Sequence, residues 1–531
     1  MAENRANRKA TGSFYTCSSI ADYLANWAIP DGNVSVLEPS FGDGRFLSSA
    51  LNRYDWLGKD DPEIYGVEMQ SAPYNAFICD HPKVNAVLSD FMDYHPPKCV
   101  DAVIGNPPYV SLKKLSKESR NKTLSLMEKY ALNMSPSGSL WMPFIVHATE
   151  LLKVNGRLGF VLPYEITYVR YAFELWKYLS THYGEIRVVR IYKDFFPEVE
   201  VETILFMAEK RGGHTDEVYY RVYNTLDDLF RDDRQLDVSI AISDILTMDK
   251  PFERALLPQH TMTLLSRLYQ KGCLQKLIDD CKFKIGYVCG DKSYFHPLQS
   301  TIQAYKIHEE NLLPCFNSSR QLVDKNNPGI ETANMNCEAK LFYPKTMDEG
   351  EIAYIKKGEE DGIDQRYKCR VRKPWYMTPS IDVPDLILSV FGNVPKLISN
   401  NGHFIVSNSL LAGTIVSTMT KEAMICRWYN SLTLLMIELS VHSLGGGTLV
   451  LIPGETDRLD IISRLPEEKV EEVYHKIRSS IHGGDLDAAY RAGDGIVLKD
   501  IFHLSDEDIS CIVEAVSILR DWRNPIKRRG D

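Results

Sequence analysis

The chain has 531 residues, enough for roughly two to four domains with substantial cores. Hydrophobic residues make up 44% and charged residues 25%, close to the average for globular proteins, which excludes a disordered, collagenous or coiled-coil chain. The formal net charge of −10 excludes a uniformly basic nucleic-acid coat. It still allows nucleic-acid binding if the basic residues gather on one face.

The cysteines and the N-terminal segment indicate the compartment. Eleven cysteines are scattered without any C-x-x-C pair, which predicts reduced thiols and argues against a compact zinc site. The first residues, MAENRANRKATG, are polar, and no run approaches the ~20 apolar residues that span a bilayer. We therefore expect a cytoplasmic protein with no metal and no membrane partner.

Residues 10–210 alternate short β-branched runs with helical patterns, which predicts an α/β domain with a mostly parallel, doubly wound sheet covered on both faces. The expected strands are Val34–Leu37, Ile64–Val67, Ala102–Gly105, Leu158–Leu162, Ile186–Tyr192 and Thr203–Ala208. The expected helices are Ser18–Ile29, Leu140–Val154 and Tyr171–His182. Ser19 and Asp22 have the spacing of a capping box at the start of the first helix.

This alternation stops near Gly212, so the first domain is expected to cover residues 1–212. Residues 213–260 are acidic and irregular, which predicts a linker or peripheral element. Residues 261–460 are interrupted by many Gly, Pro and Asn residues, as in a mixed α/β domain. Helical periodicity returns in residues 461–531, which predicts a C-terminal helical region.

The segment VLEPSFGDGRFL, residues 36–47, follows an expected strand and opens a helix. Gly42 and Gly44 allow a tight turn close to a ligand, but the third glycine of the dinucleotide fingerprint is missing. Glu38 at the strand tip suits a cationic ligand such as S-adenosylmethionine, which carries a sulfonium and an ammonium group. An ordinary strand–turn–helix connection would show the same pattern.

Two further acids follow expected strands. Glu68 ends the strand that begins at Ile64, where its carboxylate could bind ribose hydroxyls. Asp90 precedes Phe91, so an adenine amino group could donate to the acid while the ring stacks on the base. Each acid alone is also typical of a solvated loop. Three acids after three successive strands together indicate one cofactor site.

The most specific segment is Asn106-Pro107-Pro108-Tyr109 at the end of an expected strand. The prolines remove two backbone donors, so carbonyl oxygens in the turn stay available. The Asn106 side-chain oxygen and the Pro107 carbonyl could hold an aromatic amino group and favour a tetrahedral, nucleophilic nitrogen. Catalysis would then rest on positioning and electrostatics, with Tyr109 offering a face for the base.

These motifs resemble the gamma-class, Taq-type N6-adenine DNA methyltransferases of restriction–modification systems, over residues 11–210. The resemblance implies a Rossmann-like, S-adenosylmethionine-dependent methyltransferase domain followed by a mixed α/β target-recognition domain. It implies methyl transfer to the N6 amino group of a flipped-out adenine in double-stranded DNA. A cognate restriction endonuclease would act separately, and the sequence leaves its existence open.

The resemblance also assigns residues to the cofactor. The family segment before the cofactor loop is matched by Thr11-Gly12-Ser13-Phe14-Tyr15-Thr16-Cys17, where Cys17 replaces the usual proline and Thr16 holds the contact position. The implied cofactor-binding residues are Thr16, Glu38, Pro39, Phe41, Gly42, Gly44, Glu68, Asp90, Phe91 and Pro108. In Phe195-Phe196-Pro197, Phe196 is assigned to stack on the target base opposite Tyr109, with Phe195 as the alternative.

Basic residues near aromatic ones provide candidate DNA-backbone contacts, although a solvated charged surface has the same composition. The candidates are Lys113, Lys114, Arg370, Arg372 and Lys373. Three segments, 284–295, 372–376 and 444–449, resemble parts of the family's recognition domains. The basic C-terminal tail, which includes Arg520 and Arg523, is interpreted as a frayed end, with phosphate contact as the alternative.

Other functions share part of this pattern. The same catalytic turn serves methyltransferases acting on RNA bases or on a protein glutamine. The glutamine enzymes are shorter and carry an N-terminal helical domain that this pattern lacks. A DNA-binding protein with a vestigial cofactor fold is disfavoured by the intact Asn106–Tyr109 segment. No clear cluster of metal-dependent nuclease residues is apparent, so methylation without cleavage is expected.

Overall fold

The computed structural model describes residues 16–191, 203–323, 329–332, 335, 337–392, 394–442, 448–481 and 485–523. The chain divides into two compact units, Met1–Leu256 (unit 1) and Leu257–Asp531 (unit 2). Among the described residues, no helix combines the length and the hydropathy that crossing a membrane requires.

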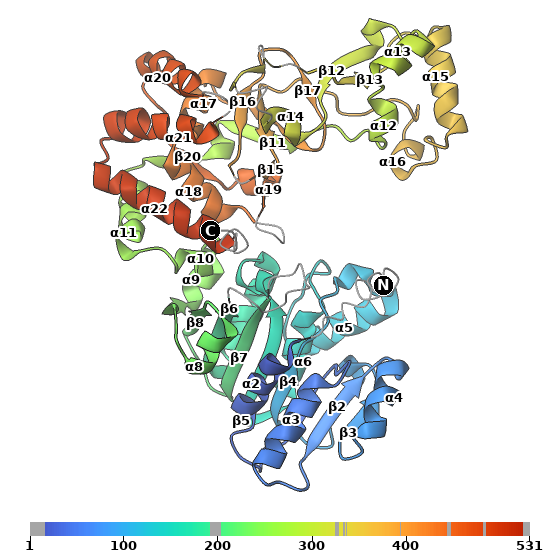
Figure 1. Ribbon diagram of the computed structural model, residues 1–531, viewed down its shortest axis with the longest axis vertical. Helices are drawn as coiled ribbons and strands as arrows, with labels where there is room; N and C mark the ends of the chain where they lie inside the picture. The colour runs from blue at the N-terminus through green and yellow to red at the C-terminus, as the bar shows by residue number, and fades with distance from the viewer. Residues whose placement is uncertain are drawn as a thin grey trace. The chain divides into compact units, whose positions relative to one another are not determined.

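Unit 1 is built on a nine-stranded sheet with the order β3-β2-β1-β4-β5-β7-β6-β8-β9 (Figure 1). Its strands are β1 Val36–Glu38, β2 Ile64–Glu68, β3 Asn85–Leu88, β4 Val100–Gly105, β5 Leu152–Pro163, β6 Tyr183–Ile191, β7 Thr203–Arg211, β8 Glu217–Tyr223 and β9 Leu236–Ala241. Neighbours from β3 to β5 are parallel. Strand β7 runs antiparallel to β5 and β6, and β9 runs antiparallel to β8.

The strand order reverses at β1, which lies between β2 and β4. In open α/β sheets such a switch point leaves a crevice beyond the carboxyl ends of the strands. The residues that follow β1, β2 and β4 are therefore brought to one edge of the sheet. This topology explains why motifs up to seventy residues apart in the sequence can form one site.

Helices cover both faces of the sheet. Helices α2 (Ser18–Ala28), α3 (Arg45–Trp56) and α4 (Ser71–Asp80) lie on one face. Their buried residues share a core with alternate residues of the strands, such as Leu205 and Met207 of β7. On the other, Trp176 of α7 (Phe173–Ser180) packs on Phe206, with ring centroids 6.2 Å apart. Helix α6 (Trp141–Glu150) precedes β5. The predicted doubly wound α/β class is confirmed.

Residues 213–260 contribute strands β8 and β9 to one edge of this sheet, so the region is a peripheral element of unit 1 and not a simple linker. Strand β8 pairs in parallel with β6, and Val218, Tyr220 and Val222 point alternately into the core. Acidic turns between the strands conceal this pattern in the sequence. The remaining helices of the unit are α8 Leu226–Arg231, α9 Ile242–Thr247 and α10 Pro251–Arg254.

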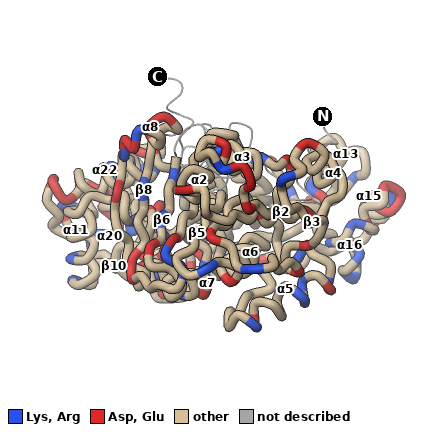
Figure 2. Tube along the Cα trace, turned by 90° about the horizontal axis from the view of Figure 1, so that it is seen from below, with Lys and Arg blue, Asp and Glu red and all other residues tan. Residues whose placement is uncertain are grey.

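Two details at helix ends also differ from expectation. Cys17 is the N-cap of α2 and makes no side-chain capping bond, so the capping box expected from Ser19 and Asp22 is wrong. The helix expected to reach Val154 ends at Glu150, because β5 begins at Leu152. After the catalytic turn come a short 3-10 turn, Leu112–Lys114, and helix α5 (Lys117–Lys129), whose basic residues are blue in Figure 2.

Unit 2 combines small sheets with helices. An antiparallel sheet has the order β11-β18-β14-β16, and a three-stranded sheet has the order β13-β12-β17. These strands are β11 Cys281–Ile285, β12 Leu312–Phe316, β13 Lys340–Phe342, β14 Leu386–Ser389, β16 Leu397–Ser399, β17 Ile405–Val406 and β18 Leu410–Ile415. The two-stranded pairs join β10 (Leu274–Lys276) to β20 (Asp460–Ile462) and β15 (Phe391–Gly392) to β19 (Leu449–Val450).

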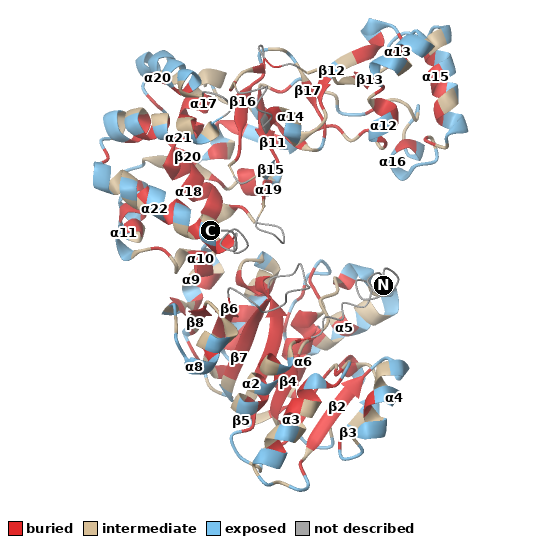
Figure 3. Ribbon diagram, in the orientation of Figure 1, coloured by how far each residue is buried: buried red, intermediate tan, exposed pale blue. Residues whose placement is uncertain are grey.

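The helices of unit 2 are α11 Gln259–Gln270, α12 Lys292–Phe295, α13 Gln299–Tyr305, α14 Ser319–Val323, α15 Glu349–Glu360, α16 Tyr367–Arg370, α17 Lys421–Trp428, α18 Ser431–Ser440, α19 Pro453–Thr456, α20 Glu467–Ser480, α21 Leu486–Gly493 and α22 Asp506–Arg523. Helices such as α15, α20 and α22 expose one side and bury the other, whereas α18 is buried over almost its whole length (Figure 3). A π-helical stretch, Asp494–Ile501, follows α21.

The last helix is part of the core of unit 2. Arg523 of α22 is buried and donates to both carboxylate oxygens of Glu438 in α18, at 2.7 and 2.9 Å. Arg520 lies 3.5 Å from the same carboxylate. The interpretation of these two arginines as a frayed basic end is therefore wrong. The C-terminal helices share their packing with helices of the region predicted as a separate domain.

Candidate active site

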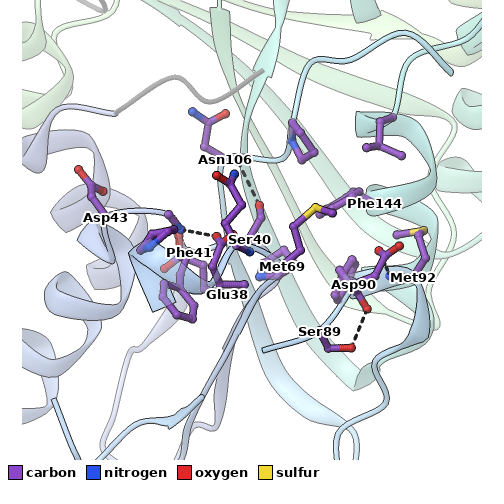
Figure 4. A pocket seen from close by; sticks show the side chains of 18 of the residues that line it. Glu38, Ser40, Phe41, Asp43, Met69, Ser89, Asp90, Met92, Asn106 and Phe144 are labelled. Carbon is purple, nitrogen blue, oxygen red and sulfur yellow. Dashed lines mark hydrogen bonds between the residues drawn. The ribbon is translucent and has the colours of Figure 1, made fainter. Parts of the chain in front are cut away.

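A cavity of about 810 Å³ opens in unit 1 where β1, β2 and β4 end. Figure 4 shows Glu38, Met69, Asn106 and Phe144 around it. Most residues predicted to bind the cofactor contribute to its wall: Thr16, Glu38, Pro39, Phe41, Gly42, Glu68, Asp90, Phe91 and Pro108. The wall combines carboxylates with flat apolar side chains, so it can accept a cationic ligand that carries a ring.

Glu38 is almost fully buried, with 2% of its surface exposed. Its Oε2 accepts a hydrogen bond of 3.1 Å from the backbone N–H of Leu47, in the first turn of α3. Burial raises the pKa of Glu38 well above its usual value, and the nearby carboxylates Asp43 and Glu68 raise it further. A cation bound beside this cluster would favour the ionised form.

Glu68 connects the loop after β1 to the turn after β2 through two hydrogen bonds. Its Oε2 accepts from the N–H of Gly42 at 2.9 Å, and its Oε1 accepts from the N–H of Gln70 at 2.7 Å. Gly44, which does not line the cavity, has a φ of +76°, and a Cβ there would lie 2.1 Å from the ring of Phe77. The loop therefore needs glycine at this position for both its conformation and its packing.

Asp90 and Phe91 form the side of the cavity beyond β3. Asp90 Oδ1 accepts from the N–H of Met92 at 3.0 Å. Phe91 is buried between Phe144 and His147, with ring centroids 4.9 and 4.8 Å away. Burial lowers the pKa of His147 to about 4, so this imidazole is neutral near pH 7. The stacking of Phe91 on an adenine ring remains a prediction.

The catalytic turn is held by contacts to two other motifs. Asn106 Nδ2 donates to Thr16 Oγ1 at 3.2 Å, and its backbone carbonyl accepts from Ser40 Oγ at 3.4 Å. Tyr109 OH donates to the Val161 carbonyl in β5 at 2.9 Å. Burial raises the pKa of Tyr109 well above its usual value, so the phenol stays protonated and its ring orientation is fixed.

Several cavity residues were missed by sequence reasoning. Ser40, Asp43 and Arg45 lie within the recognised segment 36–47 and could have been found by their position alone. Other missed residues carry no distinctive chemistry: Met69, Leu115, Ser119, Thr123, Leu140 and Phe144. Three of these belong to the stretch around α5, which was considered only for its positive charge.

The candidate DNA contacts fall into two groups. Lys113, Lys114, Arg370 and Lys373 are exposed. Arg372 instead donates from Nη1 to the Cys289 carbonyl at 2.7 Å and from Nη2 to the Val288 carbonyl. It therefore joins two of the segments predicted to belong to a recognition domain, and its expected role as a phosphate contact is not supported.

Some predicted residues lie outside the described residues. These are Phe195 and Phe196, the family segment up to Tyr15, and most of the expected closing segment 444–449. The assignment of Phe196 to the target base therefore stays a prediction. The same is true of the basic tail beyond Arg523.

Among the described residues, one group has the ligand spacing of a metal site: His308, Asp348 and Glu351 in unit 2. Glu351 Oε1 already accepts from the His308 N–H at 2.8 Å and from Asn311 Nδ2 at 2.9 Å. Burial opposes its ionisation, but these donors outweigh that cost and lower the pKa of Glu351 to about 2. The group is explained by its internal hydrogen bonds.

Comparison with known proteins identifies both units. Residues 80–196 match the model of the Eco57I restriction-modification methylase family. Residues 249–498 match the model of the C-terminal domain of type II methyltransferase M.Eco57I. The first match includes the catalytic turn of unit 1, and the second covers much of unit 2. The chain is therefore similar to methyltransferases of restriction-modification systems.

Individual relatives agree with these matches. The chain is 23% identical over 404 residues to type II methyltransferase M.AccI of Acinetobacter calcoaceticus, and the alignment covers 72% of each chain. It is 25% identical over 339 residues to M.BstVI of Geobacillus stearothermophilus, covering 53% of this chain and 58% of that protein. The chain therefore spans less than two thirds of the second relative.

A solved structure supports the fold. The type IIL restriction-modification enzyme MmeI, solved in complex with DNA, superposes with a TM-score of 0.59 at 12% sequence identity. The superposition covers 95% of this chain and 75% of the MmeI chain. It therefore extends through both units of the chain.

Proposed function

We propose that the chain is a sequence-specific DNA adenine methyltransferase, which transfers a methyl group from S-adenosylmethionine to the N6 amino group of an adenine flipped out of duplex DNA. The observation that carries this proposal is the position of Asn106 at the rim of an acid-lined cavity, directly after β4. An amide oxygen there suits an amino group rather than a hydroxyl or thiol nucleophile.

The residues of the cavity fit the proposed cofactor. Glu38 supplies buried negative charge for the cationic end of the molecule, and Asp90 supplies an acceptor at the other side of the wall. Phe41, Met69, Phe91 and Phe144 supply apolar surface for a purine ring. When bound, S-adenosylmethionine would supply an electrophilic methyl group, and the protein need form no covalent intermediate.

The protein's part in the reaction is positioning. Asn106 Oδ1 and the Pro107 carbonyl would accept the two N–H groups of the adenine amine, which favours a tetrahedral nitrogen with an accessible lone pair. Tyr109 would present its ring to the base, since its hydroxyl is committed to the Val161 carbonyl. These contacts would replace part of the stacking lost when the base leaves the duplex.

Binding to duplex DNA would use the exposed basic residues Lys113 and Lys114 of unit 1 and Arg370 and Lys373 of unit 2. Their charge is local, because the whole chain carries a net charge of −10. The relatives whose names include a type II methyltransferase function support DNA as the substrate. A separate endonuclease that cleaves the unmethylated site would complete the system.

The decisive experiment incubates the purified chain with radiolabelled S-adenosylmethionine and random-sequence duplex DNA, single-stranded DNA or RNA. We expect label in duplex DNA alone, released on digestion as N6-methyl-2′-deoxyadenosine. Sequencing of the modified positions would then give the recognition site. Label in RNA would replace the proposal with RNA methylation, and label on cytosine of DNA would contradict the choice of the adenine amine.

A further inference from the structure

The proposed mechanism makes the orientation of the Asn106 carboxamide decisive. The two ends of a carboxamide have almost the same shape but opposite hydrogen-bonding character. With the oxygen toward the substrate, the side chain accepts from the amine. With the nitrogen toward the substrate, two donors face each other and the amine is repelled. Something in the protein must therefore hold the nitrogen on the other side.

Thr16 is placed to do this. Its Oγ1 accepts a hydrogen bond of 3.2 Å from Asn106 Nδ2, and the residue is buried, with 3% of its surface exposed. Ser40 Oγ donates to the Asn106 backbone carbonyl at 3.4 Å, which fixes the main chain of the same residue. The side-chain nitrogen and the backbone oxygen of Asn106 are thus both held from outside the catalytic turn.

Thr16 is in turn held by the cofactor loop. Arg45 Nη1 donates to the Thr16 backbone carbonyl, and Arg45 Nε forms an ion pair of 2.7 Å with Asp43 Oδ2. Asp43 lies between β1 and α3, Arg45 is the first residue of α3, and both line the same cavity. A continuous series of contacts therefore runs from the loop that would hold the cofactor to the amide that would hold the target.

We propose that Thr16 is the positioning residue that orients the Asn106 carboxamide with its oxygen toward the target amine, and that the Asp43–Arg45 pair braces Thr16. This inference rests on the proposed function and deepens it. It assigns the hydroxyl of Thr16 to the catalytic amide, whereas the family resemblance assigns Thr16 to the cofactor.

The test compares Thr16→Val, which keeps the shape of threonine without its hydroxyl, with Thr16→Ser, which keeps the hydroxyl. For Thr16→Val we expect the single-turnover rate of methyl transfer at saturating cofactor and DNA to fall about 10- to 100-fold. The cofactor dissociation constant, measured by calorimetry, should change less than about threefold. Thr16→Ser should restore the rate to within about threefold of the wild type.

A matched control is Thr247→Val, on α9 of the same unit. Thr247 is exposed and bonds only to the Ser243 carbonyl of its own helix among the contacts described, at 2.7 Å. Its rate should equal that of the wild type. Arg45→Met, which removes the brace but leaves the hydroxyl, should lower the transfer rate by a smaller factor, about 3- to 10-fold.

The outcomes separate this inference from the proposed function. An inactive wild-type chain would overturn the proposed function. An active wild type with an equally active Thr16→Val variant would overturn the inference alone. Weaker cofactor binding in Thr16→Val without a lower rate at saturation would return Thr16 to the cofactor. A lower unfolding midpoint of Thr16→Val, together with a transfer rate that Thr16→Ser does not restore, would also count against positioning. The rate would then follow the stability of the protein and not the hydroxyl group.

Discussion

The motifs of unit 1 and those of unit 2 differ in what their side chains contact. At the strand tips, Glu38 and Asn106 line an open cavity. In unit 2, the corresponding segments bind one another: Arg372 holds the carbonyls of residues 288 and 289, and Asp291 pairs with Arg366. A recognisable motif therefore lines a cavity in one unit and holds two segments together in the other.

The packing of Trp375 extends this contrast. Its ring lies 5.5 Å from that of Tyr294, and its Nε1 donates to Glu359 at 3.1 Å. A Cβ on Gly358 would lie 2.6 Å from the Trp375 ring. The aromatic residues of the 284–295 and 372–376 segments thus form a core. DNA-reading residues in unit 2 should be sought among its exposed side chains instead.

The largest effect is expected at the catalytic turn. Asn106→Ala removes the acceptor for the target amine, so the rate of methyl transfer should fall at least about 1,000-fold. Cofactor affinity should stay within a few-fold of the wild type. Ser40, in the loop that would hold the cofactor, donates to the backbone carbonyl of Asn106, and this contact remains in the alanine variant. Single-turnover kinetics and calorimetry on the same preparation test both halves. A variant with activity within a few-fold of the wild type would contradict the assignment.

Glu38 should control cofactor affinity through its charge. Because burial raises the pKa of this carboxyl in the free protein, a cationic cofactor should bind with release of a proton. Affinity should rise as the pH increases through the pKa of the free protein and then level off. Glu38→Gln should weaken binding about 10- to 100-fold and abolish this dependence.

Calorimetry in two buffers with different ionisation enthalpies measures the released proton directly. Glu63→Gln, at a carboxylate whose Oε1 accepts from the Tyr65 hydroxyl outside the cavity, is a matched control. Binding of the wild type without proton release would mean that Glu38 is already ionised in the free protein.

In unit 2, Arg372 and Arg370 separate internal support from surface charge. Arg372→Ala removes the guanidinium donors from two carbonyls, of which that of Cys289 keeps a donor in Cys369 Sγ at 3.8 Å, so the free energy of unfolding should fall by about 2 kcal/mol. Arg370→Ala removes an exposed side chain and should change it by no more than about 0.5 kcal/mol. Urea unfolding of the two variants provides the comparison. Equal stability would contradict the internal role of Arg372.

The smallest effect is expected for phosphate contacts. Arg370→Ala and Lys373→Ala should each lower the slope of log affinity for duplex DNA against log salt by about 1, with little change in sequence preference. Fluorescence anisotropy over a range of salt concentrations measures this slope. Lys250→Ala supplies a substitution of a basic residue in unit 1 without an assigned DNA contact, and its slope should match that of the wild type.

The sequence predicts a site residue where a distinctive side chain stands at the end of a recognisable strand. Glu38, Glu68 and Asn106 are found because each has a distinctive side chain at the end of a recognisable strand. Met69 and Phe144 are not found, because an apolar residue can equally pack into a core. Strand β8 is hidden by acidic turns, although its buried residues Val218, Tyr220 and Val222 alternate, and β9 has one buried residue, Ile240.

The error at Arg372 has a different cause. Composition identifies a basic segment near aromatic residues, but it cannot show which guanidinium groups are already occupied by backbone carbonyls. Arg370 and Arg372 are two residues apart in the sequence, yet one is exposed and the other holds residues 288 and 289 in place. Only tertiary structure separates these two roles.

The buried pairing of Arg523 with Glu438 has a consequence for the order of folding during synthesis. Until Arg520 and Arg523 emerge from the ribosome, Glu438 lacks two cationic partners that compensate its buried charge. All the strands of unit 1 have emerged long before that point, so its sheet can form cotranslationally. Unit 2 completes its core late, and a ribosome stalled shortly before residue 523 would carry one finished unit and one that still needs protection from aggregation.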